Sequence, residues 1–394
     1  MKNVYIVSAQ RSPLTKAKRG GLAKVRPDEL LAKIIKKSVA DSKVNPSDIE
    51  DVVIGCAFPE GEQGLNIARI SALLAGLPDT APGITINRYC SSGLNSIAMV
   101  ANRIAVGEID VAVAGGVESM SMVPMMGNKF SVSSQIFEDE DNAGLAYGMG
   151  ITAEKVAQKW NISRAEQDTF AAASHARAYK AQQDGTFNEE IVPIDIDLHT
   201  INYATGELVQ KTKTISQDDG IRPETTVESL GKLRPVFDTK GSVTAGNSSQ
   251  MTDGAAALVL VSEDYLKKHN LKPIGRFVSF AVTGLAPEIM GAGPIKAIPK
   301  VLEKAGLKLD QIDLIELNEA FAAQSLAIIK ELGLNPDKIN PTGGAISMGH
   351  PLGATGAILS TKILHALKRT GGKYGIVSMC IGGGMGAAGI LEAM

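Results

Sequence analysis

Cys90 has the strongest claim to a chemical role in this sequence. It lies in the segment N-R-Y-C-S-S-G-L-N, between a β-prone run at Gly83–Asn87 and a helical pattern at Leu94–Val106. A thiol at the start of a helix faces unpaired backbone N–H groups and the positive end of the helix dipole. That environment lowers a thiol's pKa and favours the nucleophilic thiolate. The segment alone fits either such a nucleophile or a structural cysteine, because free cysteines are among the most buried residues.

His350 is the strongest candidate for a base. Glycines crowd it in the segment G-G-A-I-S-M-G-H-P-L-G-A-T-G, and a helical pattern at Gly353–Thr370 follows it. The other four histidines occupy polar or helix-face positions that are typical of ordinary surface or core groups. A phosphate-binding loop is excluded, because the glycines are not followed by Lys-Ser/Thr and do not form a strand–G-x-G-x-x-G–helix unit.

Two more motifs follow apolar strands near the C-terminus. Cys380 opens C-I-G-G-G-M-G, where glycines let the backbone approach a ligand and point N–H groups at it. Asn318 opens N-E-A-F at the end of a strand, where α/β sheets present functional side chains. Its amide can hold a water or orient a histidine, whereas Glu319 fits a structural role.

These groups together suit acyl transfer combined with carbanion chemistry. Cys90 would be the covalent nucleophile and His350 the base that activates it. Cys380 would be a second acid/base that exchanges a proton with a substrate carbon. We predict no metal site, because the cysteines and histidines lack C-x-x-C or H-x-x-H spacing.

The elements that position these groups form a repeated pattern. Apolar strands alternate with helices from Val4 to Gly116, and the pattern returns from about Leu271. The run I-E-D-V-V-I-G-C-A-F precedes Cys90 by about as many residues as I-D-L-I-E-L-N-E-A-F precedes His350. This internal duplication predicts an α/β fold of two similar sheets packed face to face, with helices on both faces. A pseudo-twofold axis would then bring the Cys90 and His350 turns to one pocket.

The segment between the two halves has a different character. It contains helical patterns at Thr152–Gln158 and Arg164–Gln183, with Ser163 as a predicted N-cap, and a polar stretch over 191–240 that we predict to be irregular. Four methionines between 120 and 126 fit either loop packing or a soft wall for an acyl or pantetheine chain.

Composition narrows the class of protein. The 394 residues are 44% apolar and 21% charged with a net charge of −2, which is typical of a globular protein and offers nothing for nucleic acid or a membrane surface. Three cysteines argue against a disulfide framework and for a reducing, cytoplasmic location. The N-terminus lacks a signal-peptide pattern, and no apolar run is long enough to span a bilayer.

The four motifs around Cys90, Asn318, His350 and Cys380, in this order and over essentially the whole chain, resemble the thiolase family. The resemblance implies a thiolase-type fold with two duplicated mixed α/β sheets and a loop domain. The N-terminal half would be residues 1–118 with 247–270, the loop domain 119–246 and the C-terminal half 271–394.

The resemblance also implies an activity. Thiolases cleave a 3-oxoacyl-CoA with CoA to a shortened acyl-CoA and acetyl-CoA, reversibly and through an acyl-cysteine. By motif, Cys90 is similar to the acylated cysteine and His350 to its base, which also binds the thioester oxygen with a water held by Asn318. Cys380 is similar to the proton-exchanging residue, and the N–H groups of Cys90 and Gly382 to an oxyanion hole.

For CoA, the resemblance implies contacts from the loop domain. Arg222 would lie at the nucleotide end with Ser229 nearby, Ser249 would contact the pantetheine, and Met149 would line the substrate pocket. CoA would be a substrate and no cofactor would be needed. A homodimer or homotetramer is also expected.

One departure bears on the substrate. Biosynthetic acetoacetyl-CoA thiolases carry V-C-G-S-G and Y-H-M-G, whereas this chain has Y-C-S-S-G and Y-G-M-G, with Gly148 in place of the histidine. Gly148 should widen the acyl side of the pocket, which favours a degradative thiolase of fatty-acid β-oxidation over an enzyme that condenses two acetyl-CoA. A ketosynthase would want a second histidine at Cys380, and a non-catalytic acyl-CoA carrier would be expected to lose Cys90 or His350.

Overall fold

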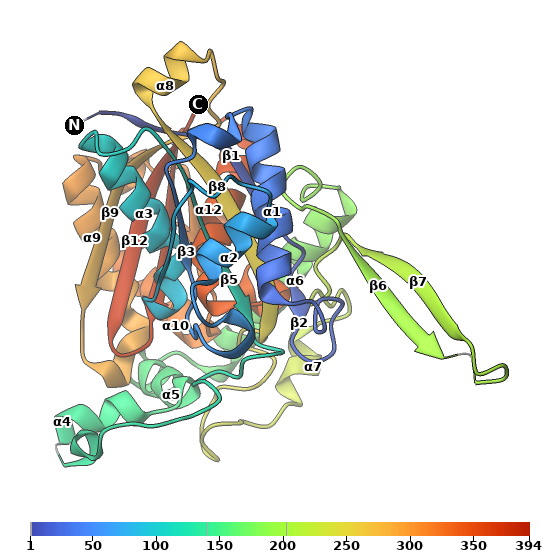
Figure 1. The fold of residues 1–394 in the computed structure, drawn as a ribbon. Helices are drawn as coiled ribbons and strands as arrows, with labels where there is room; N and C mark the ends of the chain where they lie inside the picture. Colours follow the sequence, from blue (N-terminus) through green and yellow to red (C-terminus); the bar gives the residue numbers. More distant parts are fainter. Residues whose placement is uncertain (1, 139, 202) are drawn as a thin grey trace.

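The computed structural model describes residues 2–138, 140–201 and 203–394 (Figure 1). In these ranges a ten-stranded mixed sheet has the order β10-β11-β12-β9-β1-β8-β5-β3-β4, with the short β2 paired to β8. The strands are β1 (Val4–Arg11), β2 (Thr15–Lys16), β3 (Asp51–Gly55), β4 (Gly83–Ile86), β5 (Val111–Ser119), β8 (Thr252–Ser262), β9 (Gly275–Gly284), β10 (Leu314–Leu317), β11 (Tyr374–Ile381) and β12 (Met385–Ala393).

The order of these strands confirms the internal duplication. The first half runs β4-β3-β5-β8-β1, and the second runs β10-β11-β12-β9. An isolated parallel bridge between Ile315 and Ile339 lies where β4 would have its counterpart. Equivalent strands of the two halves pair in parallel, β3 with β5 in the first half and β10 with β11 in the second.

The sequence predicted two separate sheets, and the structure differs from that prediction in one respect. β1 and β9 pair antiparallel over Val4–Ile6 and Gly275–Phe277, so the strands form one continuous sheet. Each half would otherwise leave these strands as unpaired edges, and pairing satisfies their backbone N–H and C=O groups. Facing parts of the sheet are separated by two buried helices, α3 (Ser92–Ala105) and α12 (Leu352–Thr370), as Figure 1 shows.

Helices α3 and α12 form the centre of the molecule. Residues of both helices share one hydrophobic core with residues of β1, β5 and β8 from the first half and β11 and β12 from the second. The outer faces are covered by α1 (Pro27–Ser42) and α2 (Ile67–Leu74) on the first half, and by α9 (Gly293–Ala305) and α10 (Ala322–Leu332) on the second. Pro27 begins α1, because its fixed φ suits the first turn of a helix.

Glycines allow the two central helices to touch backbone to backbone. A Cβ at Gly356 would lie 2.2 Å from the backbone nitrogen of Leu94, and one at Gly93 would lie 2.7 Å from that of Ala357. No side chain fits at such distances, so these positions require glycine for reasons of space rather than of backbone conformation.

The segment between the halves carries α5 (Met149–Trp160), α6 (Arg164–Gln183) and α7 (Val227–Gly231). Ser163 caps α6 through a complete capping box with Glu166, as its position before the helical pattern predicted. The boundaries of the three predicted domains stay predictions. The remaining short helices are α4 (Glu140–Ala143), α8 (Glu263–Lys268) and α11 (Ala345–Met348).

The prediction that residues 191–240 are irregular is wrong. They contain α7 and an antiparallel hairpin of β6 (Ile194–Ile201) and β7 (Leu208–Ile215), which projects from the body of the molecule in Figure 1. The alternation I-D-I-D-L at the start of this stretch is a period-two strand signal that its overall polarity obscured. None of the described helices is long and apolar enough to cross a membrane.

We predict that Gly356→Ala is strongly destabilising, because its methyl group must push the backbone of α3 away from α12. The free energy of unfolding, measured by urea denaturation, should fall by about 3 kcal/mol or more. Gly231→Ala is the matched control, since a Cβ there meets nothing within 4 Å, and its stability should stay close to wild type. Equal stability of the two variants would contradict the close approach of the helices.

Candidate active site

Cys90 lies in a single 3₁₀ turn, Tyr89–Ser91, that leads from β4 into α3. The turn is fixed by its neighbours: the Ser92 hydroxyl donates to the Tyr89 carbonyl at 2.7 Å and accepts from the Arg88 N–H at 2.8 Å. Asn87 accepts the N–H of Tyr89 at 2.8 Å. The half-buried Cys90 side chain packs against a small cluster of Ala57, Met120 and Leu352. The strand-to-helix placement predicted from the sequence is therefore confirmed.

The predicted pKa of Cys90 is wrong in direction. Burial raises the pKa of the Cys90 thiol to about 12, although hydrogen bonds from the backbone N–H groups of Gly382 and of Cys90 itself act to lower it. The negative charge of Glu118 raises it further. Removal from water outweighs the favourable backbone groups, so the resting residue is a thiol and needs a base to become a nucleophile.

His350 has the properties of that base. It lies between α11 and α12, and is only 5% exposed. Burial lowers the pKa of its imidazole to about 4, so the ring is neutral at pH 7 and can accept a proton. Nδ1 lies 2.6 Å from the Thr355 hydroxyl and Nε2 lies 3.3 Å from the Asn318 amide nitrogen. The tautomer with its proton on Nδ1 satisfies both contacts and places the basic lone pair on Nε2.

Asn318 and Cys380 approach from neighbouring strands. Asn318 follows β10, its N–H donates to the Ser378 carbonyl of β11 at 2.9 Å, and its side chain meets His350. Its amide oxygen is buried and finds no hydrogen-bond partner among the residues that the structure describes. Of the two roles that the sequence left open, the structure shows the contact with a histidine. Glu319 is buried and accepts hydrogen bonds from Ser174 and Asn340, which fits the structural alternative.

Cys380 lies in β11 and is 1% exposed. Burial raises the pKa of its thiol well above the ordinary range, and the nearby Cys90 raises it further. The two thiols are thus close enough to interact electrostatically. Gly382 follows on the same strand end, and its N–H donates to the Cys90 sulfur, so the glycine run faces the nucleophile as its composition predicted.

The site is assembled across the duplication. The turn that holds Cys90 belongs to the first half and packs against α12 and β11 of the second. His350 immediately precedes α12, and Cys380 lies on β11. The structure therefore brings the two helix starts together, as the pseudo-twofold relation predicted.

Met149, at the start of α5, lies on the open side of this site. Its sulfur is 3.9 Å from the point where a Cβ of Gly382 would be, so it borders the glycine run. A role of Met149 in lining the substrate pocket stays a prediction. A Cβ built on the preceding Gly148 meets nothing within 4 Å. Gly148 is exposed, so a larger residue at this position would occupy open space next to Met149.

The residues predicted to contact CoA are less closely grouped. Ser249 is half-buried and its N–H donates to the Ala320 carbonyl at 2.9 Å, beside the Asn318 motif. Arg222 is exposed, with its N–H donating to Nδ1 of His175 at 3.1 Å. Ser229 is exposed and its hydroxyl completes the capping box of α7 by accepting the N–H of Thr226 at 3.1 Å, and it also donates to the Thr226 carbonyl at 2.8 Å. These contacts account for this serine without a ligand.

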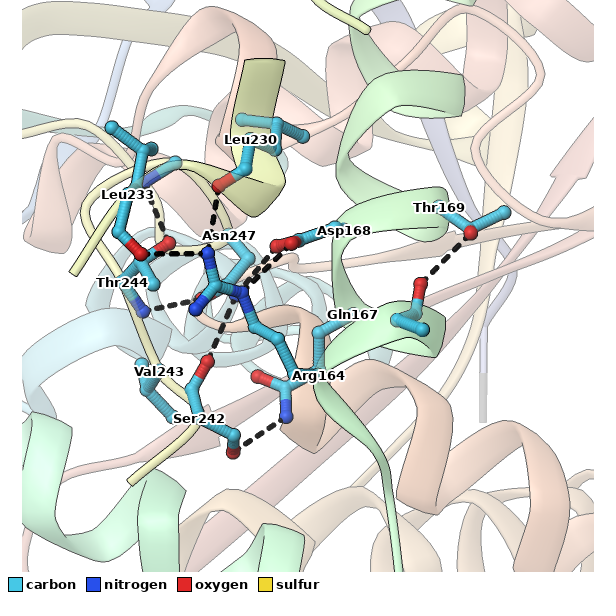
Figure 2. A network of polar contacts seen from close by, with 12 residues as sticks. Arg164, Gln167, Asp168, Thr169, Leu230, Leu233, Ser242, Val243, Thr244 and Asn247 are labelled. Carbon is cyan, nitrogen blue, oxygen red and sulfur yellow. Dashed lines mark hydrogen bonds and ion pairs between the residues drawn. The ribbon is translucent and has the colours of Figure 1, made fainter. Parts of the chain in front are cut away.

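A polar network fixes the loops that carry two of these serines (Figure 2). Arg164 of α6 donates to Asp168 at 2.7 Å and to the carbonyl of Leu230 at 2.7 Å, next to Ser229. Asn247 donates to Asp168 at 3.0 Å and accepts from the N–H of Thr244, which orders the chain just before Ser249. The first turns of α6 thus hold both loops in place.

Three buried residues near the site escaped sequence reasoning. Thr355 contacts His350 five residues on, a spacing that places both near the start of α12. Glu118 and Gln63 are hydrogen-bonded to each other at 2.5 Å and lie behind Cys90. The only available signal was an acidic residue at the end of an apolar strand, which the sequence does not distinguish from an exposed one.

The chain resembles known proteins of one family over its whole length. Residues 4–264 match the family described as "Thiolase, N-terminal domain" and residues 271–393 match "Thiolase, C-terminal domain". The 3-ketoacyl-CoA thiolase of Bacillus subtilis (strain 168) is 50% identical over 392 residues, covering 100% of both chains. Crystal structures of human mitochondrial 3-ketoacyl-CoA thiolase and Bacillus anthracis acetyl-CoA acetyltransferase each superpose with a TM-score of 0.89, at 39% and 40% identity, over 100% of this chain and 99% of theirs.

We predict that iodoacetamide alkylates Cys90 before Cys56 and Cys380, which are both buried. Because the pKa of Cys90 is raised to about 12, the thiolate fraction and the alkylation rate should keep rising from pH 7 to pH 9 without a plateau. Mass spectrometry of tryptic peptides measures both results, and prior acylation should protect Cys90. A plateau below pH 8 would show a stabilised thiolate, and equal labelling of Cys56 would contradict selective reactivity.

Proposed function

Because the chain belongs to the thiolase family, we propose that it cleaves 3-oxoacyl-CoA with CoA to give acyl-CoA and acetyl-CoA through a thioester on Cys90. This activity serves the degradation of fatty acids by β-oxidation. The observation that carries the proposal is that the Cys90 turn of the first half packs against the start of α12, which directly follows His350, and lies beside the Cys380 thiol of the second half. CoA enters as a substrate, and no proposed step calls for a cofactor.

In the first step His350 takes the proton of Cys90 and the sulfur attacks the 3-oxo carbon. The backbone N–H groups of Cys90 and Gly382, which face the sulfur at rest, support an oxyanion hole for the tetrahedral oxygen. Each such donor typically lowers the barrier by about 3–4 kcal/mol. Collapse of this intermediate breaks the bond between C2 and C3 and leaves the acyl group on Cys90.

The leaving fragment is the carbanion of acetyl-CoA. The His350–Asn318 pair would hold its thioester oxygen, while the Cys380 thiol gives its proton to C2. The raised pKa of Cys380 suits this order, because the residue is protonated at rest and acts first as an acid. Cys380 then takes the proton of the incoming CoA, whose sulfur attacks the thioester and releases acyl-CoA from Cys90. The departing Cys90 sulfur regains the proton that His350 took in the first step.

The acyl side of the pocket supports a chain longer than acetoacetyl. Gly148 faces open space, and a groove of about 270 Å³ lined by Phe58, Tyr89 and Met126, among others, adjoins the Cys90 turn. A preference for short chains is the second candidate, favoured by the structural likeness to the Bacillus anthracis acetyl-CoA acetyltransferase.

A homo-oligomer, a dimer or tetramer, is part of the proposal. β4 lies at one end of the strand order and so leaves backbone groups unpaired. Beside it lie the exposed apolar side chains of Leu65, Leu73, Leu74 and Ile84. Association through this edge would cover both features. Three unpaired cysteines support a reducing, cytoplasmic location.

We predict that Cys380→Ala separates acyl transfer onto Cys90 from condensation and thiolysis. Transfer of an acyl group from a simple acyl-CoA onto Cys90 should persist, because His350 and the oxyanion donors remain. Claisen condensation and thiolysis should fall by about 100-fold or more, because the acid/base is lost. Intact-protein mass spectrometry follows the acyl-enzyme and CoA release follows condensation. Condensation at the wild-type rate would rule out Cys380 as the acid/base, and a Cys90→Ala control should form no acyl-enzyme.

We predict a higher kcat/KM for thiolysis of a long-chain 3-oxoacyl-CoA than of acetoacetyl-CoA. Gly148→His should remove this preference by filling the open space, lowering kcat/KM for the long chain by about tenfold or more while leaving acetoacetyl-CoA nearly unchanged. Wild-type enzyme that turns over only acetoacetyl-CoA would instead establish the short-chain candidate.

A further inference from the structure

Glu118 is a buried carboxylate that the proposed chemistry does not use. It lies in β5 directly behind the site and is 1% exposed. Among the described residues no lysine or arginine donates to it; its partners are the backbone N–H groups of Ala57, Phe58 and Gly353 and the amide of Gln63. Burial raises the pKa of this carboxyl, and its four hydrogen-bond donors act to lower it. Holding a charge in such a place is costly, so its retention asks for a function.

One carboxylate oxygen of Glu118, Oε2, connects the two halves of the site. Oε2 accepts from the N–H of Gly353 at 2.8 Å and from that of Ala57 at 2.8 Å. Gly353 is in the first turn of α12, three residues after His350, and its N–H is one that a helix leaves unpaired. The same oxygen thus joins the start of α12, which directly follows His350, to the segment that follows β3.

From Ala57, further hydrogen bonds lead to the turn that holds Cys90. The carbonyl of Ala57 accepts from the side chain of Asn87 at 2.9 Å, and Asn87 in turn accepts the N–H of Tyr89 at 2.8 Å. Tyr89 precedes Cys90. One carboxylate is therefore linked, by hydrogen bonds, to the turn that holds the thiol and to the helix start that holds the imidazole.

The surroundings leave no room for this carboxylate to move. A Cβ at Gly353 would lie 2.7 Å from Oε2 of Glu118 and 2.6 Å from the nitrogen of Ala57, so the three groups touch. Gln63, itself fully buried, donates to Oε1 at 2.5 Å and to the Phe58 carbonyl at 2.9 Å, and accepts the N–H of Ser119. Each acceptor position of Glu118 is directed to a fixed donor.

We propose that Glu118 is a positioning residue that aligns the imidazole of His350 with the thiol of Cys90 by clamping the start of α12 to the support of the Cys90 turn. The inference rests on the proposed function, because it concerns the pair that starts that reaction. The clamp acts through backbone groups, so it fixes the alignment before any substrate arrives.

The charge of Glu118 gives the clamp a second, measurable effect. The titratable groups on which Glu118 acts are Cys56, whose sulfur lies 3.9 Å from Oε1, and Cys90. Burial is the main cause of the raised pKa of Cys90, and the charge of Glu118 raises it further. Removing the charge should therefore make Cys90 more reactive toward a small alkylating agent while the enzyme turns over more slowly.

The test uses Glu118→Gln in the full-length enzyme. Glutamine keeps the shape but turns one acceptor into a donor that faces backbone N–H groups. We expect kcat for thiolysis to fall by about 10- to 100-fold with KM for CoA little changed, because a misplacement of about 1 Å has effects of this size. Alkylation of Cys90 by iodoacetamide at pH 8 should become about three- to tenfold faster, since the neighbouring negative charge is gone.

Two further variants sharpen the result. Glu118→Asp keeps the charge but not the reach, so its kcat should fall while its alkylation rate stays at the wild-type value. Glu154→Gln is the matched control, since Glu154 is also buried and accepts backbone N–H groups, from Ser242 and Val243, which support neither the Cys90 turn nor the start of α12. Its melting temperature should fall as much as that of Glu118→Gln, with kcat near wild type.

The inference is overturned if Glu118→Gln keeps kcat within twofold of wild type. It is equally overturned if kcat and the alkylation rate fall together by the factor that Glu154→Gln shows, since that is the signature of general destabilisation. Failure of the proposed function looks different: wild-type enzyme would then not cleave 3-oxoacyl-CoA at all, while the alkylation rates of the Glu118 variants would still report the charge beside Cys90.

Discussion

The close contact between α3 and α12 is the constraint on which the rest of the structure depends. Glycines at 93 and 356 let the two backbones meet, so that both helices fit between the facing parts of the sheet. Because each helix begins at its own half's functional turn, this contact also sets the distance between the turns. The strands on both sides pack against this pair in the same hydrophobic core, and the outer helices cover the strands from outside.

Burial decides the chemistry of the site more than any single hydrogen bond does. It raises the pKa of both thiols and lowers that of His350, so that all three groups are neutral at pH 7. A neutral thiol beside a neutral imidazole transfers its proton only as charge develops on the substrate. Such a site does not hold a permanently reactive thiolate, which protects Cys90 from adventitious oxidation or alkylation between turnovers.

The sequence carried enough information for the duplication, for most strands and helices, and for the placement of Cys90, His350 and Cys380. Periodicity and capping signals are local, and Pro27 and Ser163 mark helix starts as the structure has them. Three features depended on tertiary context. The pKa of Cys90 follows from its surroundings, the β1–β9 pairing joins strands far apart in sequence, and Glu118 shows its role only once its donors from three segments are seen. The β6–β7 hairpin is a different case. The alternation of apolar and polar residues at its start indicated a strand, but the polarity of the whole stretch led to the prediction of an irregular segment.

The position of β8 has a consequence for how the chain is made. β8 lies between β1 and β5, yet it follows the whole of α5, α6 and the hairpin in sequence. During synthesis from the N-terminus, the first sheet therefore has a vacant central place until residue 262 has emerged. The apolar edges of β1 and β5 stay open over that interval, which is when an incomplete chain is most exposed to aggregation. The nascent first half cannot complete its sheet before β8 has been made. Its folding therefore depends on synthesis of the whole insertion.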